Sequence, residues 1–144
     1  MAKIPAVLKE PIATAFPMHV CLVASVLPDG YAQVSPRGSV MVYDDDNLAI
    51  WERGHGSTTA NMNDGTKLTV YFQDFALAQS GVLPKAGVAR FYGPAEVHRS
   101  GPVYDKVWEK LIEPEKGRDP DKKGYAVLIK VERVEDLSGD PIPA

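Results

Sequence analysis

Apolar and polar residues alternate along several short segments of this chain, a pattern that is typical of half-buried β-strands. Segment 67–73 is the clearest, because Leu68, Val70 and Phe72 fall on one face of an extended chain and the residues between them on the other. Five further segments, each rich in β-branched and apolar residues, predict strands at 18–27, 31–43, 48–52, 87–99 and 125–135. The sequence therefore predicts six strands.

Helical spacing is found in two places. Val103, Val107 and Leu111 repeat at four-residue intervals, which predicts a helix that begins near Pro102 and buries one side. A shorter helix is predicted at 57–63, ahead of Gly65, which suits a left-handed cap. Three segments are expected to be irregular, with at most short helical turns in the first because of its prolines: 1–17, 74–86 and 113–123.

The order and spacing of these elements predict the fold class. Short connections favour antiparallel pairing, and two strands carry irregularities at which a sheet can bend, one at Pro36 and one at Gly93-Pro94. Six strands with two such bulges favour closure into a small barrel. We expect a mostly β fold, a six-stranded antiparallel β-barrel with two or three short helices, in a single domain over residues 1–144.

Charge and composition exclude several classes of function. The net charge of −3 and the pI of about 5.6 argue against a nucleic-acid partner, which normally needs a basic face. No segment approaches the ~20 apolar residues of a membrane span, and no signal peptide is evident. Cys21 is the only cysteine, so it forms no internal disulfide and fits a reducing compartment. We expect a cytoplasmic protein with no membrane partner.

The first candidate binding segment is Ser35-Pro-Arg-Gly-Ser39. If the strand keeps its alternation, Ser35, Arg37 and Ser39 share one face, whereas Val34, Val40 and Val42 point into the barrel. Polar groups in line around Gly38, which admits close approach to the backbone, suit a planar ligand with hydrogen-bonding edges. The alternative interpretation is an exposed strand edge with an ordinary Pro-Gly irregularity.

The second candidate segment follows the strand at 48–52. Arg53 precedes a Gly-His-Gly loop and the helix start at Ser57-Thr58-Thr59, with Asn61 one turn later. Free amide groups at a helix start, hydroxyls and a guanidinium together predict a phosphate site. The alternative is that Ser57 or Thr58 only caps the helix. The segment matches neither the Walker P-loop nor the dinucleotide fingerprint.

The sequence gives little indication of metal binding or of catalytic side chains. His19 and Cys21 lie two residues apart in a strand, but without a third ligand a structural role is favoured over metal binding. His55, between two glycines, is a candidate for ligand contact or for an acid, and its role stays open. We find no arrangement for covalent catalysis and name no catalytic residue.

From about residue 18 to residue 136, the chain resembles the pyridoxamine 5′-phosphate oxidase-like family of FMN-binding split barrels. The strand order carries the resemblance, together with three motifs: Ser35-Pro-Arg-Gly38, Leu48-Ala-Ile-Trp-Glu-Arg53 followed by Ser57-Thr-Thr-x-Asn61, and Gly87-Val-Ala-Arg-Phe-Tyr-Gly-Pro-Ala-Glu-Val97. The family implies a six-stranded split barrel that forms a homodimer, with one FMN in each of two clefts between the subunits.

By this resemblance, the segment from Arg37 to Val40 and the pair Trp51 and Glu52 would line the isoalloxazine ring and the ribityl chain. The phosphate end would lie near the second candidate segment: Arg53, Ser57, Thr58, Thr59 and Asn61. Ser57 and Thr58 stand where the family often has basic phosphate ligands, so hydroxyls would replace charge unless Arg37 or Arg53 compensates.

The resemblance implies an FMN-dependent oxidoreductase acting on a small-molecule substrate or electron donor. Oxidation of pyridoxamine phosphate itself is not expected, because the chain lacks the Arg- and His-containing C-terminal motif of the true oxidases. Two alternatives stay open: a flavin-binding carrier or sensor without turnover, and a deazaflavin-dependent reductase. A twofold dimer is also expected on physical grounds, because a groove on one small barrel cannot bury a ligand of this size.

Overall fold

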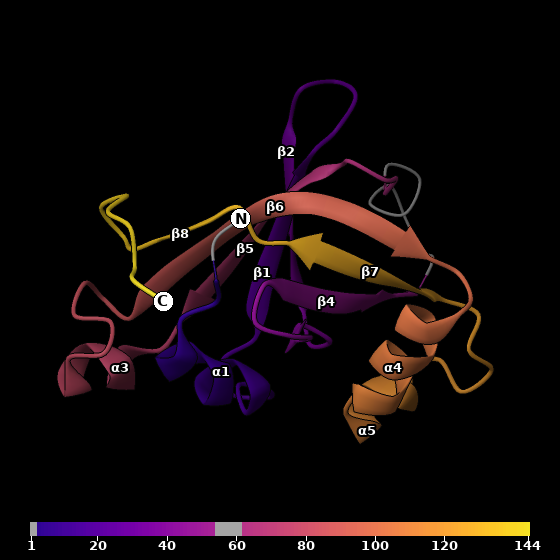
Figure 1. The fold of residues 1–144 in the computed structure, drawn as a ribbon, viewed down its shortest axis with the longest axis horizontal. Coiled ribbons are helices and arrows are strands. Elements are labelled where there is room, and N and C mark those ends of the chain that lie inside the picture. Colours follow the sequence, from indigo (N-terminus) through magenta and orange to yellow (C-terminus); the bar gives the residue numbers. More distant parts are fainter. Residues whose placement is uncertain (1–2, 54–61) are drawn as a thin grey trace.

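The computed structural model describes residues 3–53 and 62–144, which form one curled antiparallel sheet with short helices (Figure 1). Its strands are β1 (Cys21–Val26), β2 (Ala32–Arg37), β3 (Met41–Val42), β4 (Asn47–Glu52), β5 (Lys67–Gln73), β6 (Val88–His98), β7 (Tyr125–Lys130) and β8 (Arg133–Glu135). Along the sheet the order is β2-β1-β5-β6-β7-β4-β3, and β8 pairs with β6. The predicted mostly β, split-barrel fold is confirmed.

The sheet becomes a barrel because its two end strands are consecutive in the chain. β2 and β3 lie at opposite ends of the strand order, and residues 38–40 connect them directly. The single strand predicted at 31–43 is therefore divided. The strand predicted at 125–135 is divided as well, because β7 pairs with residues 95–98 of β6 and β8 pairs with residues 90–92. Six predicted strands thus correspond to eight observed ones.

The interior of the barrel holds the main apolar core. Alternate residues of β5, namely Leu68, Val70 and Phe72, point into it, as the sequence pattern predicts. Both faces of β4 are buried, as are both faces of its neighbour β7. Leu48 and Ile50 face the interior, whereas Ala49 and Trp51 belong to a second cluster under a helix on the outer face.

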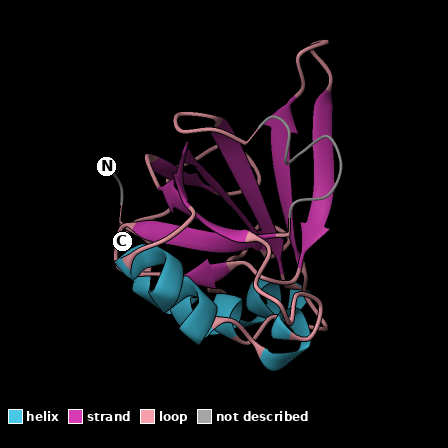
Figure 2. Cartoon of the chain, turned by 90° about the vertical axis from the view of Figure 1, so that its right-hand side faces the viewer, coloured by secondary structure: helices cyan, strands magenta, loops and turns pink. Residues whose placement is uncertain are grey.

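The described helices are α1 (Ala6–Ala13), α3 (Phe75–Ser80), α4 (Pro102–Lys110) and α5 (Glu113–Lys116). Figure 2 shows them gathered at one end of the barrel. The prediction of α4 is confirmed, whereas residues 57–61 of the other predicted helix lie outside the described residues. Within the described ranges, none of the helices has the length and apolar character needed to cross a membrane.

Three segments that the sequence predicts to be irregular contain helices. α1 runs for eight residues and includes Pro11, because Leu8 and Ile12 bury their side chains completely or almost completely in the core. α3 is capped by the Asp74 carboxylate, which accepts a hydrogen bond from the Ala76 amide. α5 is a single turn. Packing and capping outweigh the weak periodicity in these segments.

Candidate functional site

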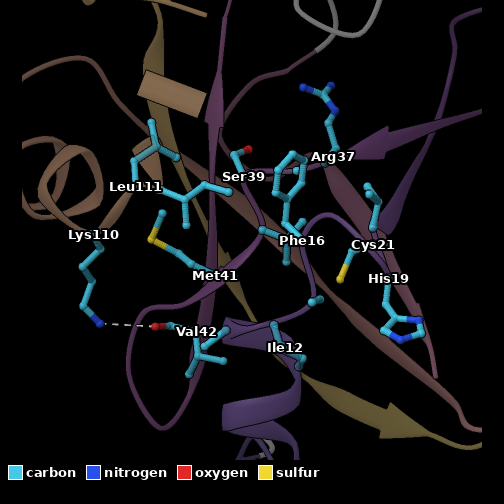
Figure 3. Close-up of a pocket in the computed structure, with 16 residues that line it drawn as sticks. Ile12, Phe16, His19, Cys21, Arg37, Ser39, Met41, Val42, Lys110 and Leu111 are labelled. Carbon is cyan, nitrogen blue, oxygen red and sulfur yellow. Dashed lines mark hydrogen bonds between the residues drawn. The ribbon is translucent and has the colours of Figure 1, made fainter. Parts of the chain in front are cut away.

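A pocket of about 250 Å³ lies between the end of α1, the connection from β2 to β3, and the end of α4 (Figure 3). Its walls are mostly apolar, and the residues that set its character are Ile12, Phe16, Cys21, Met41 and Leu111. Four of the residues predicted to bind a cofactor also line it: Arg37, Gly38, Ser39 and Val40. The fold therefore brings the first candidate segment to a mostly apolar pocket at the helical end of the barrel.

The bend between β2 and β3 changes which side chains face the interior. Ser35 and Arg37 pair with Val23 and Cys21 of β1, so both point inwards, and the prediction that they share a face is confirmed. Val34 is 57% exposed, so the prediction that it points into the barrel is wrong. The physical reason is the register of β2 on β1, which places the polar residues of β2 opposite the buried residues of β1.

Beyond the bend the alternation is shifted by one residue. Val40 and Val42 pack against the interior core as predicted, but Met41 belongs to the outer cluster. Ser39 lies on this outer side, where its hydroxyl bonds the backbone of Trp51. The prediction that Ser39 shares a face with Ser35 and Arg37 is therefore wrong, because the turn at Gly38 interrupts the strand.

Gly38 is required by packing within the chain. A Cβ at this position would lie 2.8 Å from Glu115 Oε2 and 3.0 Å from Phe16 Cδ2. The close approach that the sequence predicts at Gly38 is thus made by two side chains of the protein itself. Glu115 is 6% exposed and lies in α5, whereas the sequence predicts a charged loop there.

A buried ion pair connects the two candidate segments. Arg37 Nη2 lies 2.8 Å from Glu52 Oε2, and the side chains are only 15% and 3% exposed. In Figure 3 the Arg37 side chain extends away from Phe16 and Met41. Arg37 Nε is buried and has no hydrogen-bond partner within the described part of the chain. The pocket therefore has one guanidinium at its edge, and a carboxylate already balances its charge.

The Trp51 side chain serves packing under α4. Its ring lies 5.1 Å from the Tyr104 ring and 4.9 Å from the Trp108 ring, and its Nε1 donates a hydrogen bond of 2.8 Å to Asp119 Oδ2. Trp51 as a whole is 2% exposed, and its amide and carbonyl already bond the Ser39 hydroxyl.

The Asp119 carboxylate accepts three hydrogen bonds near the end of β4. Besides the Trp51 indole, the amides of Lys123 and Gly124 donate to its carboxylate at 2.9 and 2.8 Å. Burial alone would raise the pKa of Asp119, but these hydrogen bonds and the nearby charge of Arg53 hold the pKa below its usual value. The carboxylate thus ties the start of β7 to the end of β4.

Tyr125 is the cross-strand partner of Glu52 and lies beside the ion pair. The guanidinium carbon of Arg99 lies 4.1 Å from the centre of the Tyr125 ring. Burial, and next the charge of Glu52, raises the pKa of the Tyr125 hydroxyl. Its oxygen is buried, and the neighbouring Arg99 guanidinium opposes this rise.

Sequence reasoning missed several residues around this site. Phe16 and Lys110 lie in a predicted irregular segment and on a helix surface, yet both line the pocket, and Lys110 Nζ donates to the carbonyl of Val42 at 3.3 Å (Figure 3). Arg99 and Tyr125 are distant in sequence and meet only across β6 and β7. No local signal marks either residue.

Other predicted residues stay untested. Ser57, Thr58, Thr59, Asn61 and His55 lie outside the described residues. His19 lies at the pocket edge, with Nε2 3.5 Å from Asp74 Oδ1. Across residues 3–53 and 62–144, no group of three or more potential metal ligands is found. Cys21 is buried, and burial raises the pKa of its thiol to about 12.

Comparison with known proteins identifies the same family as the sequence motifs. The sequence model of the family described as pyridoxamine 5′-phosphate oxidase matches residues 10–138. Among curated proteins, no sequence matches significantly.

Solved structures with the same fold include HupZ from Group A Streptococcus, which is 26% identical, with 96% of this chain and 98% of that chain covered and a TM-score of 0.71. A putative pyridoxamine 5′-phosphate oxidase from Lactobacillus delbrueckii is 25% identical, with 93% and 98% covered and a TM-score of 0.61. An FMN-binding protein from Syntrophomonas wolfei is 13% identical, with 88% and 81% covered and a TM-score of 0.56, so its likeness concerns the fold alone.

Proposed function

The chain belongs to the pyridoxamine 5′-phosphate oxidase-like family, and from this premise we propose that it is an FMN-binding oxidoreductase that works as a homodimer. The observation that carries the proposal is the pocket beside residues 37–42, where an apolar cavity meets the edge of a buried ion pair. A flavin has the same two requirements: apolar walls for its ring and donors for its polar edge.

The residues present fit such a cofactor. Phe16, Met41 and Leu111 offer apolar contacts for a flat ring, and the backbone of residues 37–40 supplies amide donors and carbonyl acceptors at the rim. Arg37 Nε is a buried donor without an acceptor in the described part of the chain, which an incoming acceptor atom would satisfy. The phosphate end is proposed to lie towards Arg53 and residues 57–61, in agreement with the sequence motif.

In this function the flavin carries the redox chemistry, and the chain binds and orients it. A bound flavin supplies hydride or single-electron transfer. The apolar walls orient the ring and exclude water, and the Arg37–Glu52 pair keeps the adjacent backbone in place. No described side chain is proposed as an acid or base, and the substrate is a small molecule that enters from the open side of the pocket.

The size of the pocket supports a dimer. Its volume of about 250 Å³ is below the roughly 300–1,000 Å³ of pockets that bury a ligand of cofactor size. A second subunit would supply the missing wall. Three large apolar side chains towards the tip of the β1–β2 hairpin, away from the pocket, are also exposed and available for a contact between subunits: Val26, Tyr31 and Val34.

The test is the colour and the redox behaviour of the purified protein. A flavin spectrum with about one flavin per chain, in a dimer by light scattering, is the expected result. Anaerobic reduction by NADH or NADPH, followed by reoxidation in air, would support an oxidoreductase. Binding without reduction by either donor would instead favour the carrier or sensor. Tighter binding of a deazaflavin than of FMN by the apoprotein would replace the proposed cofactor, and binding of neither would overturn the proposal.

A further inference from the structure

Three arginines surround the end of β4, and the structure gives them different partners. Arg37 is balanced by Glu52, 2.8 Å away. Arg53 lies close enough to Asp119 for its charge to lower the pKa of that carboxyl group. Arg99 forms no ion pair with any residue in the described ranges. The segment 54–61, which follows Arg53, contains no acidic residue in the sequence. Arg99 therefore carries the uncompensated positive charge at this corner.

Arg99 is held in place although it is exposed. It follows directly after β6, and its guanidinium stacks on the ring of Tyr125 at 4.1 Å. Tyr125 is itself 2% exposed and fixed in β7 opposite Glu52. A stacked guanidinium loses less freedom on binding an anion than a mobile one, and its free edge still presents several N–H donors.

A buried donor lies near this guanidinium. Arg37 Nε is buried and has no hydrogen-bond partner within the described residues. The Tyr125 hydroxyl is also buried, and the neighbouring Arg99 guanidinium interacts with it. Buried donors without acceptors are rare in folded proteins and point to a group that is added on binding. A group with several acceptor oxygens and negative charge fits this donor together with the charge of Arg99.

We propose that Arg99, stacked on Tyr125, is a phosphate-binding residue of this protein and holds the terminal phosphate of the flavin nucleotide. The assignment rests on the proposed flavin binding and adds a residue that the sequence motif does not contain. Glu52 already balances the charge of Arg37, so Arg99, which directly follows β6, supplies the positive charge for the phosphate.

The test compares two flavins that share a ring and differ in the phosphate. The apoprotein is titrated with FMN and with riboflavin, using the wild-type chain and Arg99→Met. Loss of a charge-assisted hydrogen bond is expected to weaken FMN binding by about 10- to 100-fold. Riboflavin affinity should stay within about twofold, because the ring site is unchanged. Arg99→Lys, which keeps the charge, should recover part of the lost FMN affinity.

Arg133→Met provides a matched control. Arg133 also stacks on a tyrosine at 4.1 Å, but on Tyr92, and it pairs with Glu135 at 3.2 Å. FMN affinity should not change in this variant. If wild-type protein binds FMN and riboflavin equally, or if Arg99→Met leaves FMN affinity unchanged, the assignment of Arg99 is overturned while flavin binding stands. If the wild-type protein binds neither flavin, the proposed function fails together with it.

Discussion

The hydroxyl of Ser39 takes the place of a backbone partner for Trp51. It accepts a hydrogen bond from the Trp51 amide at 3.2 Å and donates one to the Trp51 carbonyl at 3.3 Å. The turn at Gly38 draws the backbone out of the ladder, and the side chain bridges the gap between the β2–β3 connection and β4. The pocket rim is thus fixed to the sheet by one buried hydroxyl.

Ser39→Ala should therefore destabilise the fold by about 1–3 kcal/mol, because it leaves a buried amide and a buried carbonyl unpaired. Urea denaturation, followed by circular dichroism, measures this loss. Ser35→Ala is the control, because Ser35 lies on β2 and should change the free energy of unfolding by no more than about 0.5 kcal/mol. Equal stability of the two variants would contradict the role given to Ser39.

The Arg37–Glu52 pair should be worth far more to the fold than a surface ion pair. Removing one partner, as in Glu52→Ala or Arg37→Ala, leaves a buried charge and should cost about 3–5 kcal/mol in unfolding free energy. A double variant, Arg37→Met with Glu52→Leu, should recover most of that loss because no charge is left buried. Single variants that unfold like the wild type would show that the pair is not closed in solution.

Asp119 makes part of the stability depend on pH. Burial would raise the pKa of Asp119 in the folded state, but the hydrogen bonds to the carboxylate outweigh this effect and lower it. The contribution of Asp119 to the free energy of unfolding is therefore fully present above the unfolded pKa of about 3.9. It is lost as the pH falls through the folded pKa. Asp119→Asn should cost about 1–3 kcal/mol at neutral pH. The difference from wild type should shrink below about pH 4. Denaturation curves across pH 3–7 measure it, and a constant difference would contradict this account.

Gly93 allows β6 to change neighbours from β8 to β7. A Cβ there would lie 2.0 Å from the Lys130 carbonyl oxygen, a backbone atom that cannot move without distorting β7. Gly93→Ala should cost at least about 3 kcal/mol, at the upper end for overpacking, or prevent folding. The control is Gly117→Ala, because its nearest atoms would be 3.5 Å away and its φ is −63°. Thermal denaturation of both variants measures this difference, and equal melting temperatures would contradict the role given to Gly93.

Cys21 should be unreactive in the native protein although it lines the pocket. Burial raises the pKa of its thiol to about 12, so very little thiolate is present at pH 8. A chromogenic disulfide reagent should label one thiol per chain only after denaturant is added. Rapid labelling of the native protein would mean that the pocket opens to solvent more widely than the structure shows.

The sequence by itself determined the fold class and the family, and every observed strand overlaps a predicted one, although two predicted strands are each divided in two. Alternation in segment 67–73 predicted the observed bounds of β5, and the motif at residues 35–39 marked three residues that line the pocket: Arg37, Gly38 and Ser39. These features are local: a period of two residues, a proline, or a glycine acts within one strand, so each can be recognised without knowing its neighbours.

Only the tertiary structure decided which side chains meet. The register of β2 on β1 turned Val34 outwards and Arg37 inwards, towards Glu52. The pairing of β4 with β7 brought Tyr125 beside that pair, and the end of β6 added Arg99. Register and the order of strands depend on contacts between segments far apart in the chain, and a shift of one residue reverses every face. For that reason the strands were predictable, whereas the charge balance around the pocket was not.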